Sequence, residues 1–145
     1  MHAARRSLAA VLMIVTIALS ACGADAEQAL SEARDRAAEL SDQISSGVDA
    51  AREEIEQAGE SATEVDQALD EAKQAGEDGR AALEEAASNA GDEANQRLED
   101  ARTGLEEAEA KLDKVKESVP ESVQGALDEV RSQMAELRDR IDEAL

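Results

Sequence analysis

The chain has 145 residues, with 35 acidic side chains against 15 Lys and Arg, so its formal net charge at pH 7 is −20, and it contains no aromatic residue. An acidic chain without aromatic rings lacks both the bases that neutralise phosphates and the platforms that stack on bases, which excludes nucleic-acid binding. The sole histidine is His2 and the sole cysteine is Cys22. We therefore expect no metal ligands, no catalytic residues and no enzyme, because acid–base and nucleophilic catalysis usually use such side chains.

Residues 1–21 have the pattern of a secretory signal. Arg5 and Arg6 give a positively charged start, and an apolar run follows from Leu8 to Leu19. A charged start, a short apolar core and small residues at its end are typical of a cleaved targeting segment. The run is too short for a bilayer, which needs about 20 apolar residues, so we do not expect an uncleaved transmembrane anchor.

The lone cysteine lies directly after this run. Leu19-Ser20-Ala21-Cys22 resembles the lipobox of bacterial lipoproteins, in which Leu, two small residues and Cys stand at the cleavage boundary. The resemblance implies cleavage before Cys22, a diacylglyceryl group on its sulfur and an N-acyl chain, with no other cofactor. Residues 22–28 would then be the acylated cysteine and a short tether at the outer side of the cell membrane. The alternative is an ordinary signal peptide with an incidental cysteine.

Residues 29–117 are rich in Ala and Glu, which favour helix, and their apolar residues recur at spacings of three and four. The series opens with Leu30, Ala33, Ala37, Leu40 and Ile44. Such heptads with inserted slips predict long amphipathic helices in a coiled coil or an antiparallel bundle. The fold class predicted is therefore all-α with no sheet. Bends are expected near 45–48, 76–79 and 88–94, where the heptad pattern slips or Gly and Asn gather.

Residues 118–145 carry the strongest heptad pattern and predict a separate amphipathic helix from about 119 to 144. Ser118 is expected as its N-cap, Pro120 lies in the first turn, and Glu121 would complete a capping box. The apolar positions of this segment are Val123, Leu127, Val130, Met134, Leu137, Ile141 and Ala144.

Basic residues flank the apolar stripe and acidic residues crowd the opposite face. Placing the sequence on heptads puts twelve of the bases beside the stripe, namely Arg34, Arg36, Arg52, Lys73, Arg80, Arg97, Arg102, Lys111, Lys116, Arg131, Arg138 and Arg140. A parallel dimer would set Arg against Arg, whereas antiparallel packing within or between chains brings acids nearer to these bases. Within one helix, Glu32–Arg36, Glu136–Arg140 and Asp128–Arg131 have the spacing of ion pairs.

The sequence predicts a membrane-anchored, non-enzymatic structural or interaction module of the bacterial cell envelope. Its partners would be membrane lipid, through the anchor, and a helical protein or an antiparallel second copy. The lipobox followed by heptads is similar to murein lipoprotein, but that family ends in Lys and this sequence ends in Leu145, so wall attachment by that route is not expected. The alternative is lipid association, because bases beside an apolar stripe resemble the pattern of exchangeable apolipoproteins.

Overall fold

The computed structural model describes residues 24–59, 63–89 and 91–145. The predicted signal and lipobox, residues 1–22, lie outside them. The described chain forms four helices: α1 (Ala24–Ala58), α2 (Thr63–Ser88), α3 (Asp92–Lys116) and α4 (Glu121–Ala144). The described residues contain no strand. The all-α prediction is confirmed.

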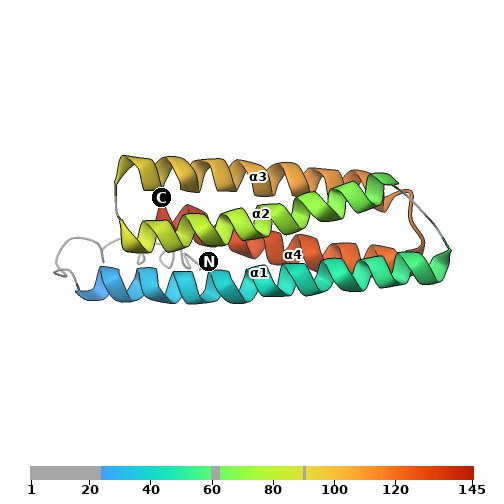
Figure 1. Ribbon diagram of the computed structural model, residues 1–145, viewed down its shortest axis with the longest axis horizontal. Helices are drawn as coiled ribbons and strands as arrows, with labels where there is room; N and C mark the ends of the chain where they lie inside the picture. The colour runs from blue at the N-terminus through green and yellow to red at the C-terminus, as the bar shows by residue number, and fades with distance from the viewer. Residues whose placement is uncertain (1–23, 60–62, 90) are drawn as a thin grey trace, which may run out of the picture.

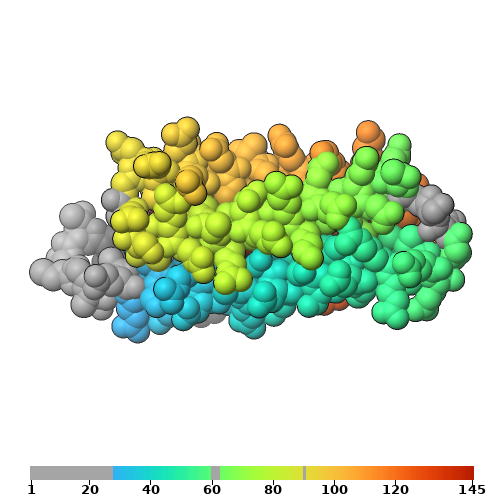
Figure 2. Space-filling view, in the orientation of Figure 1, coloured from blue at the N-terminus to red at the C-terminus, as the bar shows by residue number. Residues whose placement is uncertain are grey.

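The four helices run alternately up and down in one elongated bundle (Figure 1). Each helix packs against its neighbours in sequence, and α4 closes the bundle against α1. The backbones of α2 and α4 approach each other across one diagonal, whereas within the described ranges those of α1 and α3 stay farther apart. Figure 2 shows α2 lying between α1 and α3 along one face. Of the predicted alternatives, antiparallel packing within one chain is the arrangement that the structure has.

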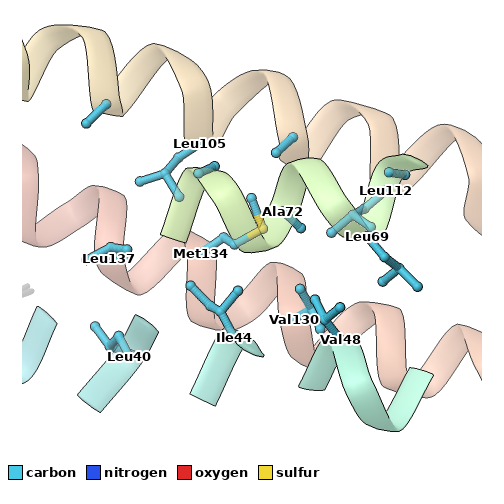
Figure 3. Packing of buried hydrophobic residues seen from close by; sticks show 14 of the residues in the cluster. Leu40, Ile44, Val48, Leu69, Ala72, Leu105, Leu112, Val130, Met134 and Leu137 are labelled. Atoms are coloured by element: carbon cyan, nitrogen blue, oxygen red, sulfur yellow. The ribbon is translucent and has the colours of Figure 1, made fainter. Parts of the chain in front are cut away.

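The core consists of the apolar positions that the heptads select. Figure 3 shows side chains from the four helices turned toward a common interior. The largest fully buried side chains are Leu40, Ile44, Val48, Leu69, Leu83, Leu98, Leu105, Leu112, Leu127, Met134, Leu137 and Ile141. Alanines fill many of the remaining core positions. Each buried Leu, Ile or Met contributes about 1.5–3 kcal/mol relative to exposure, so these residues carry most of the hydrophobic stabilisation.

The first helix ends where the sequence predicted no boundary. The apolar pattern passes through residues 58–65 without a break, yet α1 ends at Ala58 and α2 begins at Thr63. Gly59 has φ of 71° and donates its N–H to the carbonyl of Glu56 at 3.1 Å. This left-handed conformation is a common way to end a helix, and glycine adopts it without a Cβ penalty.

The regions of expected bending behave differently from one another. Helix α1 continues through 45–48 and α2 through 76–79 without interruption, whereas α2 ends and α3 begins within 88–94. Gly76 and Gly79 are buried in α2 and lie close to Ile44 and Leu137 respectively. Glycine serves there to let neighbouring helices approach closely rather than to form a turn.

The capping prediction for the last helix is wrong. Helix α4 begins at Glu121 after an N-cap at Pro120 that makes no side-chain capping bond. The Ser118 hydroxyl instead donates to the carbonyl of Val115 at 2.7 Å, at the end of α3. A serine hydroxyl can bond to a nearby carbonyl as readily as to a free N–H, so the sequence motif alone did not decide which helix it serves.

Candidate functional site: the anchor boundary and the charged bundle surface

The predicted attachment residue, Cys22, and the box residues Leu19, Ser20 and Ala21 lie outside the described residues. The structure therefore neither brings these four residues together nor separates them. The first described residue is Ala24, at the start of α1 (Ala24–Ala58). Only Gly23 separates the predicted attachment residue from the first residue of a helix.

Eight of the twelve bases that flank the apolar stripe form ion pairs between neighbouring helices. Antiparallel packing brings the acids of one helix beside the bases of the next, as the charge pattern predicted. The pairs are Arg36–Glu136, Arg52–Asp70, Arg97–Glu85, Arg102–Asp142, Lys111–Glu71, Lys116–Asp128, Arg131–Asp113 and Arg138–Glu109. These bases therefore lie over the seams between helices, bound to carboxylates.

The pairs predicted within single helices are present only in part. Asp128 and Arg131 are 3.6 Å apart. Arg36, however, contacts Glu39 at 2.6 Å and Glu136 at 3.2 Å rather than Glu32. These two carboxylates, Glu39 foremost, raise the pKa of Arg36. Arg140 likewise pairs with Glu143 at 3.0 Å rather than with Glu136. Glu136 of α4 thus pairs with Arg36 of α1, a partner that the sequence of one helix could not indicate, whereas Arg140 pairs with another acid of its own helix.

Glu109 is the least exposed carboxylate among the ion pairs. Its side chain is 16% exposed, and Oε2 accepts a hydrogen bond from Arg138 Nη1 at 3.0 Å. Burial raises the pKa of Glu109, and this effect exceeds the opposing attraction of Arg138 and Arg131. Oε1 is buried and has no hydrogen-bond partner within the described chain. The α3–α4 seam therefore holds a carboxylate whose charged form is partly uncompensated.

The outer surface combines exposed carboxylates with shallow hollows. A hollow of about 310 Å³ lies between α2 and α3 and is floored by small residues that include Ala75, Ala82 and Ala101. Across residues 24–59, 63–89 and 91–145, no three His, Cys, Asp or Glu side chains are grouped to hold a metal ion. None of the described helices combines the length and apolar character needed to cross a membrane.

Similarity to known proteins assigns no family or function to this chain. No protein-family model, curated protein or solved structure matches the chain. Its function must therefore be argued from its own residues.

The sequence did not reveal the close approach of α1 and α4 at Gly47. A Cβ built on Gly47 would lie 2.8 Å from Val130 Cγ2. A glycine beside a heptad seam is a signal for such an approach, but its partner helix could not be identified from the pattern. The burial of the Glu109 carboxylate depends on the packing of α3 against α4, so the sequence alone could not indicate it.

Proposed function

We propose that this chain is a lipid-anchored, non-enzymatic module of the bacterial cell envelope that presents an acidic four-helix bundle on the outer side of the cell membrane. The observation that carries the proposal is Leu19-Ser20-Ala21-Cys22 at the end of the apolar run. The positions of the four helices, Ala24–Ala58 to Glu121–Ala144, support it, because the described bundle lies wholly within the part of the chain that would remain after the proposed cleavage.

The anchor would act through the lipid chains on Cys22. Each buried CH₂ contributes about 0.8 kcal/mol, and stable anchoring needs more than one chain. A diacylglyceryl group on sulfur and an acyl chain on the new amino terminus meet that requirement. Removal of residues 1–21 also removes Arg5 and Arg6, so the formal charge of the anchored protein moves from −20 to −22.

The bundle supports a role in contact with other envelope components rather than in chemistry. Its apolar stripes are directed into the interior, and most stripe-flanking bases are held in pairs between helices. Exposed acids such as Asp49, Glu107 and Glu129 are left on the outer faces. A partner of this surface would contribute cationic or hydrogen-bonding groups, since like charges are repelled.

Lipid association by opened helices is the second candidate. The bases beside the apolar stripes favour it, because Arg and Lys stems can lie along an apolar surface while their charged ends reach phosphates. Opening would expose core residues such as Leu69 and Leu105 to lipid, but it would also break the pairs between helices. This function would be favoured if anionic vesicles, but not neutral ones, increased the helical circular dichroism signal or abolished the cooperative unfolding transition of the bundle. No response to either vesicle would exclude it.

Radiolabelled palmitate tests the anchor directly. The wild-type chain should incorporate label and fractionate with membranes, and its amino terminus should be blocked at residue 22. Cys22→Ala should lose the label and release the protein from membranes, whereas Ser20→Ala, which keeps a small residue in the box, should leave both unchanged. Equal labelling of the wild type and Cys22→Ala, or a purified chain that retains residues 1–21, would refute the proposed anchor.

A further inference from the structure

Helix α1 is longer than the helices against which it packs, and its extra length lies at its beginning. Gly76 of α2 lies opposite Ile44, and Gly47 of α1 lies opposite Val130 of α4. Antiparallel helices have the same rise per residue. Ser88, the last residue of α2, is as many residues from Gly76 as residue 32 of α1 is from Ile44. Ala144, the last residue of α4, is likewise as far from Val130 as residue 33 is from Gly47. The ends of α2 and α4 therefore lie level with residues 32–33 of α1.

Residues 24 to about 32 of α1 therefore project beyond the bundle. Figure 1 shows this segment extending past the ends of α2 and α4. Among residues 28–32, whose burial is described, Gln28, Ala29, Ser31 and Glu32 are exposed and Leu30 is half-buried. From Gln28 onward, the first buried residue of α1 is Ala37. We call residues 24–32 the stalk.

The stalk can remain helical without packing. A separate short helix is unstable in water because its first turn is costly to form, but the stalk extends a helix that the bundle has already nucleated. It contains Ala, Glu, Gln and Leu, which favour helix. Gln28 also donates a hydrogen bond to Glu32 at 3.3 Å, one turn further along. Its nine residues are separated by eight steps of about 1.5 Å, which gives a stalk about 12 Å long.

This length is significant relative to the range of electrostatic forces. The Debye length at physiological ionic strength is about 8 Å, so a bundle held beyond the stalk is largely screened from the charge of an anionic membrane. A bundle lying flat would bring exposed carboxylates such as Glu53 and Asp49 within that range. Repulsion between the acidic bundle and anionic lipid thus favours the upright orientation.

We propose that the stalk holds the bundle upright and away from the bilayer, so that the end formed by the α1–α2 and α3–α4 connections is presented about 50 Å from the lipid surface. That distance is the length of α1, 35 residues at 1.5 Å each. The inference rests on the proposed attachment of lipid to Cys22. The partner would then be an envelope component at that height, and lipid headgroups would not be the surface that the bundle recognises.

Energy transfer from single labelled positions to dyes in lipid headgroups tests the orientation. Because acylation consumes the thiol of Cys22, Gln57→Cys and Asn89→Cys each provide one reactive thiol in the full acylated chain. Gln57 is exposed at the far end of α1 and Asn89 is exposed in the connection nearest the stalk. In anionic vesicles, transfer should be several-fold more efficient from position 89 than from position 57. Equal transfer from both would show a flat bundle and overturn the proposal.

Deletion of residues 25–31 tests the stalk itself. Seven residues are close to two turns, so α1 keeps its packing face while the stalk shortens by about 10 Å. Transfer from position 89 should rise, and the melting temperature should change little because residues 28–31, the part of the deleted segment whose burial is described, include no fully buried side chain. Unchanged transfer, or a large fall in melting temperature, would contradict the inference that the stalk projects from the bundle and sets its distance from the bilayer. Acyl chains found by mass spectrometry on these samples would leave the anchor intact in either case, whereas their absence would overturn the anchor and the stalk together.

Discussion

Replacing Gly47 with Ala should destabilise the bundle although alanine favours helix. The new Cβ would lie 2.8 Å from Cγ2 of Val130, and Val130 is fully buried with a β-branched side chain that has little rotamer freedom. Overpacking of this kind costs about 1–3 kcal/mol, and the gain in helix propensity returns about 0.5–1 kcal/mol. The net expectation is a loss of about 1–2 kcal/mol, or about 4–8 °C in melting temperature.

Two comparisons isolate the cause of this loss. Gly125 also lies inside a helix, but a Cβ there would meet nothing within 4 Å, so Gly125→Ala should stabilise by about 0.5–1 kcal/mol. In a Val130→Ala background the clash is removed, and Gly47→Ala should then stabilise by a similar amount. Thermal and urea unfolding followed by circular dichroism measure all the variants. If Gly47→Ala stabilised the wild-type background as much as Gly125→Ala does, α1 and α4 could not approach each other as described.

Three further changes test the core and the charges. Leu105→Ala should cost about 2–5 kcal/mol in urea unfolding, because Leu105 is fully buried; a loss below 1 kcal/mol would contradict a packed interior. Glu109→Gln should be more stabilising at pH 7 than at pH 4. Burial raises the pKa of Glu109, so the free energy of unfolding of the wild type falls as pH rises through that pKa. The neutral Gln side chain does not ionise and avoids this loss. A difference that does not change with pH would contradict the assigned burial. A double-mutant cycle of Lys111→Ala and Glu71→Ala should give a coupling of at most about 1 kcal/mol, because both side chains are about half exposed, and a much larger value would mean that the pair is desolvated in solution.

The fold class followed from the sequence because the three- and four-residue spacing of apolar residues determines which face of a helix is buried. That pattern indicates the buried face but not the length of a helix. The boundary at Gly59 was missed since Ala58 and Val65 remain in phase across the connection, and the pattern therefore reads as continuous. A bend was expected near Gly76 and Gly79, yet α2 continues through both, because a glycine can admit a neighbouring helix as well as interrupt its own.

The prediction of the attachment site differs from the predictions of helix boundaries and ion pairs because it depends on local sequence alone. The proposal of Leu19-Ser20-Ala21-Cys22 as a lipobox uses no tertiary contact, and these residues lie outside the described part of the chain, so the proposal still depends on the sequence alone. The ion pairs are the opposite case. The bases could be placed beside the apolar stripe, but Arg36 pairs with Glu136, one hundred residues away, rather than with Glu32. Such partners are fixed only once the helices are arranged around the core.

The ion pairs match the arrangement of the helices but contribute little to its stability. Most of the paired side chains are substantially exposed, as at Arg36–Glu136 and Arg102–Asp142, and exposed pairs contribute about 0–1 kcal/mol each. The buried leucines contribute more per residue, but leucine contacts alone do not distinguish parallel from antiparallel packing. A parallel arrangement would place bases opposite bases along the same seams, and such like-charge contacts disfavour an alternative fold even where the native pairs add little. The connections between consecutive helices have only three or four residues, which is too short to run back along a helix, so they require antiparallel neighbours. The apolar residues therefore account for the stability of the bundle, the short connections account for its antiparallel topology, and the flanking charges are compatible with that topology.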